Sequence, residues 1–329
     1  MRILVTGSTG HLGEALMRTL QASHHEAIGV DLKSSPYTHH VGSITDRSFV
    51  KERMQGVEVV MHTATLHKPH MATHGRQDFV DTNITGTLNL LEEAVSAGVT
   101  SFVFTSTTSA FGRALTPPAG APAAWITEEV ACLPKNIYGT TKLSAEHLCE
   151  LFHHKSGLPC IVLRTSRFFP EDDDAKVARQ SYNDDNLKVN EFLYRRVDIE
   201  DVVAAHTLAI EKAPVIGFDR YVISATSPFT CDDLHELRRD AASVVRRYAP
   251  RYEDEYERRG WSMIPAIDRV YVNARARAKL GWQPRYDFGY VIQRLCASED
   301  YRSPLARSVG SKGYHAESFS DGPYPTEGP

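Results

Sequence analysis

Near its N-terminus the chain reads Ile3-Leu4-Val5-Thr6-Gly7-Ser8-Thr9-Gly10-His11-Leu12-Gly13, an apolar run followed by a glycine turn and the start of a helical pattern. Glycines at this spacing allow a tight bend, close approach of the backbone to a pyrophosphate and close packing of helix on sheet. The helix N-terminus then faces the negative charge. Because the turn stands between a strand and a helix, it predicts a Rossmann unit that binds a dinucleotide. The alternative is a structural turn without a ligand. The expected contacts are Gly7, Thr9, Gly10, His11, Leu12 and Gly13.

Asp31 ends the second apolar run, 18 residues after Gly13. A carboxylate at this place accepts hydrogen bonds from the adenosine ribose and repels a 2′-phosphate. Lys33 follows closely and softens that repulsion. The sequence therefore favours NAD as the cofactor, with NADP as the weaker alternative.

Short β-branched runs alternate with helical stretches through the first half of the chain, which is typical of parallel βαβ units. We predict an α/β fold, a doubly wound and mostly parallel Rossmann sheet with a smaller α+β substrate-binding domain. The NAD-binding domain is expected over residues 1–165, with later returns near 198–225. The substrate-binding domain is expected over 166–197 and 226–302, and an extended tail over 303–329. Within these ranges we expect strands at 3–6, 27–31, 57–63, 101–106, 160–164 and 221–224, helices at 14–22, 83–97, 138–155, 198–211 and 232–248, and an acidic loop at 170–185.

Composition and charge exclude several classes of partner. Of the 329 residues, 42% are hydrophobic and 24% charged, and the formal net charge is −4, which favours neither nucleic acid nor an anionic membrane. No apolar run approaches the roughly 20 residues that cross a bilayer, and the N-terminus has no signal-peptide pattern. The five cysteines are scattered and contain no CxxC pair, so we expect reduced thiols in a cytoplasmic protein.

Tyr138 and Lys142 stand four residues apart in a helical stretch, and therefore on one face of the helix. A free tyrosine has a pKa of about 10 and is a poor base at neutral pH. A lysine ammonium and the positive nicotinamide ring both favour the phenolate. Taken alone, the pair would be read as two residues on a helix surface.

Other segments occur in the order found in one family. They are the glycine turn, His62-Thr63-Ala64, Asn83–Leu91, Phe102–Gly112, Tyr138-Gly139-Thr140-Thr141-Lys142, Asp198–Val203 and Leu280–Pro284. In these segments the sequence resembles the extended short-chain dehydrogenase/reductase family, in its NAD-dependent epimerase/dehydratase branch. The resemblance is dense over residues 1–165 and looser over 195–285.

The resemblance implies roles for particular residues. Tyr138 would be the acid/base, Lys142 would bind the nicotinamide ribose and tune the tyrosine, and Thr107 would orient the substrate oxygen. Thr107 follows from counting back from Gly112, and its neighbours Ser106 and Thr108 stay possible substitutes. The remaining cofactor contacts implied are His62, Thr63, Ala64, Thr65, Asn83, Thr105, Ser43 and Ile44. Ser43 stands where the family often has aspartate, so the contact with the adenine amino group is in doubt.

The substrate side departs from the family pattern. Arg167 stands where sugar-nucleotide enzymes usually carry an asparagine that meets the substrate phosphates. A guanidinium binds phosphate or carboxylate, so the resemblance still allows an anionic substrate; the alternative is that Arg167 pairs with the acidic run 171–174. Arg195 or Arg196 is a further candidate for phosphate binding. The segment 170–195 is shorter than the family's nucleotide-clamping segment, which indicates an altered pocket.

A histidine-rich loop follows the third strand. His67 and His70 are candidate substrate contacts. Together with His62 and His74 they suggest a metal site, but no cysteine or carboxylate completes a ligand set, and we predict no metal.

The resemblance implies an NAD-dependent hydride-transfer enzyme. The leading expectation is a sugar-nucleotide epimerase that acts through a transient ketone. The second is a dehydrogenase or reductase of a non-nucleotide alcohol or carbonyl compound, and a cofactor-binding protein without catalysis is the third. Dehydration is disfavoured because Thr108-Ser109 replaces the family's Asp-Glu pair. Members of the family usually pair through a four-helix bundle that includes the tyrosine helix, so we expect a homodimer.

Overall fold

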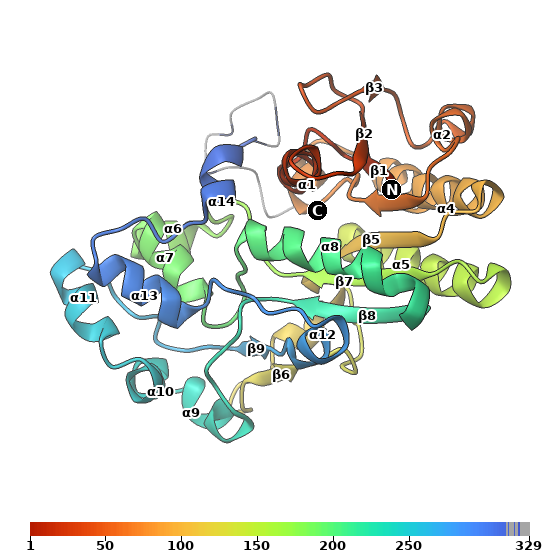
Figure 1. Cartoon of the computed structure of the whole chain (residues 1–329). Coiled ribbons are helices and arrows are strands. Elements are labelled where there is room, and N and C mark those ends of the chain that lie inside the picture. The colour runs from red at the N-terminus through yellow and green to blue at the C-terminus, as the bar shows by residue number, and fades with distance from the viewer. Residues whose placement is uncertain (314, 316–318, 320–321, 323–329) are drawn as a thin grey trace.

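A seven-stranded sheet with the order β3-β2-β1-β4-β5-β7-β8 forms the centre of the computed structural model (Figure 1). The structure describes residues 1–313, 315, 319 and 322. Every strand pairing in the sheet is parallel, which confirms the predicted doubly wound α/β class. The strands are β1 (Arg2–Thr6), β2 (Glu26–Asp31), β3 (His40–Val41), β4 (Val59–His62), β5 (Ser101–Thr107), β7 (Cys160–Thr165) and β8 (Phe218–Ile223).

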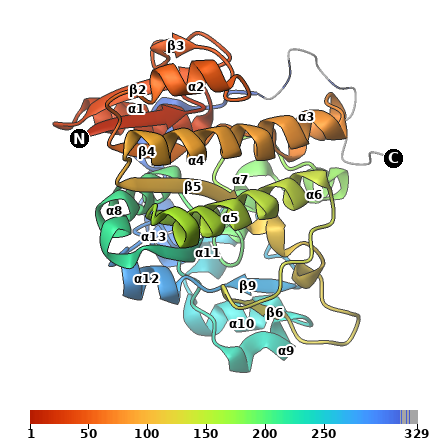
Figure 2. The same cartoon turned by 90° about the vertical axis from the view of Figure 1, so that its right-hand side faces the viewer.

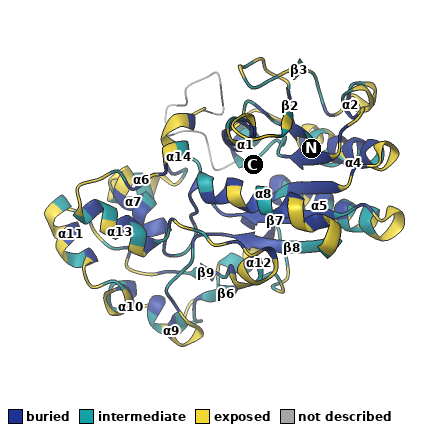
Figure 3. Ribbon diagram, viewed as in Figure 1, coloured by how far each residue is buried: buried dark blue, intermediate teal, exposed yellow. Residues whose placement is uncertain are grey.

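Helices cover both faces of this sheet (Figures 1 and 2). Each layer turns apolar side chains toward the sheet, so the central strands β1, β4, β5 and β7 are almost wholly buried, and the strands visible at the centre of Figure 3 are drawn mostly in the colour of buried residues. One layer holds α1 (His11–Gln21), α8 (Ile199–Ile216), α12 (Ala274–Leu280) and α14 (Pro304–Val309). The other layer holds α2 (Arg47–Arg53), α4 (Gly86–Ala97) and α5 (Ile137–Ser156).

The turn between β1 and α1 depends on glycine at two positions. Gly7 has φ +75°, a region that side-chain-bearing residues rarely adopt. Gly13 lies so close to this turn that a Cβ atom on it would stand 1.9 Å from the carbonyl oxygen of Gly7. The helix and the turn can approach this closely only because no side chain lies between them. The N-terminus of α1, with the N–H groups of its first turn, therefore lies at the edge of the pocket, where it can face a phosphate.

The helix expected at 83–97 begins earlier in the structure. It starts as α3 (Arg76–Val80), passes through one π-helical turn at Asp81–Thr85 and continues as α4. Wide turns of this kind are frequent at functional sites. Here the extra residue turns Asn83 inward, where only 2% of it is exposed.

A smaller unit lies beyond β8 (Figure 1). Its aromatic core includes Tyr252, Tyr256, Tyr286 and Phe288. It contains a two-stranded parallel sheet that the sequence analysis did not predict, because each strand has only three residues. Its elements are β6 (Ala124–Ile126), β9 (Arg269–Tyr271), α6 (Lys176–Ser181), α7 (Asp184–Glu191), α9 (Leu234–Leu237), α10 (Ala241–Tyr248), α11 (Tyr252–Arg259) and α13 (Phe288–Cys296). Short 3-10 turns elsewhere in the chain lie at Lys68–Ala72 after β4, Thr108–Phe111 after β5, Arg113–Leu115 and Cys231–Asp233.

Three local predictions were wrong. The single helix expected at 232–248 is broken, because Asp240 leaves the helix and its carboxylate accepts hydrogen bonds from Ser243 to begin α10. The acidic loop at 170–185 contains α6, and the tail expected from residue 303 begins with α14, which Ser303 caps and which packs on α1 and α8. Most of the tail beyond 313 lies outside the described residues.

None of the described helices is long and apolar enough to cross a membrane.

Candidate active site

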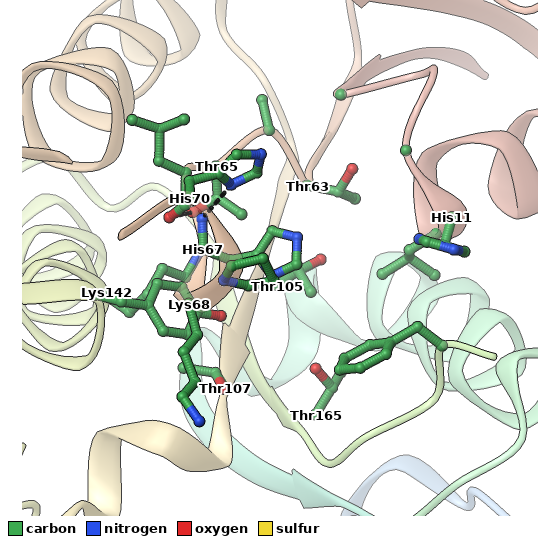
Figure 4. A pocket seen from close by; sticks show the side chains of 18 of the residues that line it. His11, Thr63, Thr65, His67, Lys68, His70, Thr105, Thr107, Lys142 and Thr165 are labelled. Carbon is green, nitrogen blue, oxygen red and sulfur yellow. Dashed lines mark hydrogen bonds between the residues drawn. The ribbon is translucent and has the colours of Figure 1, made fainter. Parts of the chain in front are cut away.

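A cavity of about 690 Å³ opens at the carboxyl ends of the strands (Figure 4). This is where doubly wound sheets bind ligands, since loops from neighbouring strands diverge there. The cavity brings together most of the residues expected from the sequence. Its lining includes Gly7, Thr9, Gly10, His11, Leu12, Gly13, Asp31, Ser43, Ile44, Thr63, Ala64, Thr65, Thr105, Tyr138, Lys142, His67, Thr107, Thr108, Arg167 and Arg195.

Three expected contacts do not line the cavity and support their neighbours instead. The buried His62 ring lies between the hydroxyls of Thr6, at 2.7 Å, and Thr87, at 2.9 Å. Asn83 donates to the Leu66 carbonyl at 2.8 Å and so holds the loop after β4. The same Asn83 amide donates to Thr141 on α5, so it joins this loop to the tyrosine helix. The third, Arg196, pairs with a buried glutamate.

Asp31 lies at the end of β2 with its carboxylate fixed by backbone groups. One oxygen accepts from the N–H of Thr9 and the other from the N–H of Lys33, each at 3.0 Å. The carboxylate is therefore held beside the glycine turn, where the ribose of a dinucleotide would lie. Ser43 is engaged with Thr45, at 2.7 Å between hydroxyl oxygens.

Asp31→Ala should weaken NAD binding about tenfold, because it removes a charged acceptor from the ribose hydroxyls. It should also reduce the discrimination against NADP, since the repulsion of the 2′-phosphate is lost. Titration of both dinucleotides by calorimetry measures the two effects. Asp254→Ala, which removes an exposed carboxylate on α11, is the control. An unchanged ratio of the two affinities would contradict the role given to Asp31.

Tyr138 lies in the first turn of α5, which begins where the Asn136 side chain accepts from the Gly139 N–H at 2.9 Å. Burial raises the pKa of the Tyr138 phenol to about 12, against the effect of a hydrogen bond with the Thr107 hydroxyl. Thr107 itself ends β5, and its hydroxyl accepts from the Ser109 N–H at 3.1 Å. The geometry therefore brings Thr107 and Tyr138 together.

Lys142 is one turn further along α5 and is only 2% exposed. Burial lowers the pKa of its ammonium to about 7, although the charge of Glu146 acts in the opposite direction. The ammonium nitrogen lies 4.0 Å from the centre of the Phe104 ring, a favourable contact for a cation. Near neutral pH this group therefore gains or loses a proton easily.

The histidine-rich loop forms the wall beside Tyr138. The His67 ring lies 6.2 Å from the Tyr138 ring and 4.9 Å from the His70 ring, measured between centres. Burial lowers the pKa of His67 well below its usual range and that of His70 to about 4, so both rings are neutral at pH 7. Among the described residues, no group of three or more His, Cys, Asp or Glu side chains is arranged to hold a metal ion.

The arginines expected to meet substrate phosphates are engaged with carboxylates of the chain itself. Arg167 pairs with Asp173, with Asp174 at 3.0 Å and with Glu191 at 3.2 Å. Arg195 pairs with Glu191 at 2.6 Å and with Asp173 at 3.0 Å. The predicted alternative, pairing of Arg167 with the acidic run, is therefore what the structure shows.

Glu191 stands at the centre of this network. Burial alone would raise the pKa of its carboxyl, but the charges of Arg195, Arg196 and Arg167 outweigh burial and lower the pKa to about 2. Because this pKa lies below the value in the unfolded chain, the carboxylate stabilises the fold above about pH 5. That contribution is lost as the pH falls toward about 2.

Glu191→Gln should destabilise the protein by about 3 kcal/mol at pH 7, because it leaves buried guanidinium groups without their partner. The difference from the wild type should shrink as the pH is lowered from about 5 toward about 2. Urea denaturation over this pH range measures it. The exposed Glu257→Gln on α11 serves as control. A difference that stays constant with pH would show that the ion pairs do not carry the stability.

Several pocket residues were not predicted from the sequence. Lys68, Ser166, Arg269 and Tyr271 line the cavity. Lys68 and Ser166 adjoin the predicted residues His67 and Arg167, which is a signal that could have found them. Arg269 and Tyr271 belong to β9, and no short-range pattern connects them to the glycine turn.

The segment after α14 also reaches the cavity. Lys312 and Gly313 are among its lining residues. Their backbone N–H groups donate to one carboxylate oxygen of Glu171, at 2.9 and 3.1 Å. The same oxygen lies 2.8 Å from the ring of His11, at the start of α1. The C-terminal segment is thereby tied to the rim of the glycine turn.

Comparison with known proteins identifies a family and similar folds. A model described as NAD dependent epimerase/dehydratase family matches residues 3–223. The UDP-glucose 4-epimerase of Rhizobium meliloti is 24% identical over 329 residues, which cover 88% of this chain and 94% of that protein. The uncharacterised protein y4nG of Sinorhizobium fredii is 29% identical over 167 residues, covering 49% of this chain and 39% of that protein. A short-chain dehydrogenase/reductase superfamily protein from Agrobacterium tumefaciens with bound NAD has a TM-score of 0.64 at 21% identity, covering 94% of this chain and 97% of that one.

Proposed function

The chain belongs to the NAD-dependent epimerase/dehydratase family, and we propose that its active site oxidises a hydroxyl-bearing carbon of a sugar-like substrate to a carbonyl, or reduces such a carbonyl to the alcohol. The chain is an NAD-dependent enzyme of the epimerase or dehydrogenase type, and its cofactor is NAD. The glycine cradle fits this dinucleotide, because a Cβ on Gly13 would fill the space that lets helix and turn approach. Asp31 at the same rim supplies an acceptor for ribose hydroxyls.

One observation carries the proposal: the buried Tyr138 phenol lies beside the Thr107 hydroxyl in the cavity, one helical turn from the buried Lys142. When bound, NAD supplies the acceptor for a hydride at nicotinamide C4. The chain supplies the proton chemistry. Thr107 orients a substrate hydroxyl, and Tyr138 holds or takes its proton at the phenolic oxygen.

The ionisation of Tyr138 depends on charge placed near it. With a pKa raised to about 12 by burial, the phenol keeps its proton at neutral pH in the free protein. A positive charge near the phenol favours the phenolate. Lys142 provides such a charge whenever its ammonium is protonated, so the two side chains act together as one proton-transfer unit.

A sugar nucleotide is the first candidate substrate, with epimerisation as the net reaction. The UDP-glucose 4-epimerase of Rhizobium meliloti supports it, since that protein is similar to this chain over 94% of its own length. The arrangement of Thr107, Tyr138 and Lys142 is compatible with this chemistry. The support comes from the relative and not from the substrate side of the pocket.

A small hydroxy compound without a nucleotide is the second candidate, with net oxidation or reduction. The specific observation that favours it is the pairing of Arg167 and Arg195 with Asp173 and Glu191. Guanidinium groups already held by buried carboxylates are poor partners for a diphosphate, because separating a buried ion pair costs about 3–5 kcal/mol.

One experiment separates the two candidates. The purified protein, loaded with NAD, is incubated with UDP-glucose and with a panel of simple sugars, sugar acids and sugar phosphates. NADH formation and sugar epimers are both measured. An epimer of the sugar nucleotide without net NADH supports the first candidate. Stoichiometric NADH from a compound of the panel supports the second, and neither product from any compound would contradict the proposed chemistry.

A homodimer in the cytoplasm is the assembly and location that we propose for this enzyme. Helices α4 and α5 pack side by side on one face of the sheet (Figure 2). Val95 on α4 is 37% exposed and Leu151 on α5 is 47% exposed, so apolar area is available there for a second copy. The five cysteines are free thiols, which suits a reducing compartment. Sedimentation of wild type and Leu151→Lys tests the interface: the wild type should be dimeric and the variant monomeric.

A further inference from the structure

The wall of the pocket opposite the glycine turn contains an arginine that, unlike Arg167 and Arg195, is not paired with a carboxylate. Arg269 lies on β9 and lines the cavity. Its guanidinium stands 5.8 Å from the centre of the Tyr194 ring, and among the described residues it donates one long hydrogen bond, 3.5 Å, to the Leu115 carbonyl. Its Nε atom is buried without a hydrogen-bond partner. No carboxylate among the described residues pairs with it.

Ser166 supplies a second polar group on this wall. It is 3% exposed, it lines the cavity, and its hydroxyl is buried without a hydrogen-bond partner among the described residues. A buried hydroxyl without a partner is unfavourable unless a ligand or water completes it. Ser166 follows β7, and its N–H donates to the carbonyl of Ile223 at the end of β8, at 2.9 Å. Tyr271 of β9 belongs to the same apolar cluster as Val222 of β8. Ser166 and β9 therefore border the same end of the sheet.

The other cations near this wall are matched by carboxylates. Lys68 pairs with Asp174, and Arg196 pairs with Glu191 at 2.8 Å. Together with the pairs of Arg167 and Arg195, this leaves Arg269 as the one arginine lining the described cavity without an ion pair. The wall thus offers one guanidinium and one hydroxyl, which is enough for a single oxyanion.

We propose that Arg269 and Ser166 form a subsite for one oxyanion of the substrate, a carboxylate or a phosphate monoester. The substrate is then a small anionic hydroxy compound, not a nucleoside diphosphate sugar. This inference rests on the second candidate function above. It places the negative charge of the substrate beside Arg269 of β9, and the ion pairs of Arg167 and Arg195 then stabilise the fold instead of binding the substrate.

Binding to the NAD-loaded protein tests the subsite without requiring turnover. Four probes that share a sugar-like body differ in charge: D-glucose, D-gluconate, D-glucose 6-phosphate and UDP-glucose. Calorimetric titration should show that gluconate or glucose 6-phosphate binds at least about tenfold more tightly than glucose and more tightly than UDP-glucose. Which of the two single anions is preferred distinguishes a carboxylate from a phosphate substrate.

Four variants locate the effect. Arg269→Gln should remove the preference for the single anion, Arg269→Lys should retain part of it, and Ser166→Ala should reduce it about threefold. Arg277→Gln changes an exposed arginine of α12 and should leave the preference for the single anion unchanged. Thermal melting of each variant verifies that the protein is folded. If Arg269→Gln does not fold, Arg269→Lys still tests the subsite, because it keeps the positive charge but loses the guanidinium.

Three results would overturn the subsite: tighter binding of UDP-glucose than of both single anions, a single-anion preference that Arg269→Gln leaves intact, or no binding of either single anion. Failure of the proposed function would be seen in the turnover assay and not in the binding assay. In that case the anion preference persists, while no probe or panel compound yields NADH or an epimer.

Discussion

The Tyr138→Phe protein should turn over its substrate about 10³-fold more slowly than the wild type, because it lacks the phenolic oxygen that exchanges the proton. The fold should persist. The aromatic ring stays in place, and the deleted hydroxyl loses only its polar contact with Thr107 among the described residues. NAD affinity should remain within about threefold, since the phenol contributes one polar contact among many. Single-turnover kinetics and calorimetry with NAD measure the two effects separately.

Tyr290→Phe is the matched control for this loss. Tyr290 lies on α13, where its ring packs against Tyr286 at 5.0 Å between centres, away from the residues that line the cavity. The control should retain full activity. A Tyr138→Phe protein with wild-type turnover would show that another group moves the proton, and His67, with its ring 6.2 Å from that of Tyr138, would be the first to examine.

Gly13→Ala should abolish NAD binding and destabilise the protein by about 4 kcal/mol or more. The added Cβ would stand 1.9 Å from the Gly7 carbonyl oxygen and 2.6 Å from its carbonyl carbon. Both are backbone atoms, so no side-chain rotation relieves the clash, and α1 must move away from β1. Urea denaturation and NAD titration measure the two losses.

Gly75→Ala provides the comparison. Gly75 precedes α3 with φ −71°, and a Cβ there meets only the Asp78 carboxylate at an ordinary 3.5 Å. This variant should match the wild type in both stability and NAD binding. If Gly13→Ala were equally harmless, the close approach of helix and turn would not be what holds the pyrophosphate.

The cofactor side was predictable from the sequence because its residues follow one another closely along the chain. The glycine turn and the pair Tyr138 and Lys142 are each fixed by local geometry, a tight βα turn in one case and a single helical turn in the other. Asp31 follows from the length of one helix and one strand. Residues this close in sequence take relative positions that the turn or the helix alone determines, so the motif in the sequence already gives the arrangement in the site.

The substrate side was not predictable in the same way. Arg269 reaches the pocket through β9, whose only strand partner is β6, far away in the sequence. Whether an arginine can bind a ligand depends on which carboxylates fold against it. Arg167 and Arg269 are indistinguishable by residue type, but only Arg167 meets Asp174 and Glu191.

Two helices show the same limit on a smaller scale. Periodicity predicts one helix over 232–248, but the Asp240 carboxylate accepts hydrogen bonds from Ser243 and starts α10 as a separate helix. Periodicity also starts a helix at residue 83, inside the π-helical turn at Asp81–Thr85, and misses α3 before it.

The most direct test of the central claim is isotope transfer between substrate and cofactor in the NAD-loaded protein. The converted compound is prepared with deuterium on the carbon that bears the reacting hydroxyl, and the reaction is quenched at several times within the first turnover, before a transferred deuteride has fully returned to the substrate, and analysed by mass spectrometry. We expect deuterium on the nicotinamide of the wild type and none in Tyr138→Phe. Product formed by the wild type while its cofactor stays unlabelled throughout the turnover would contradict it.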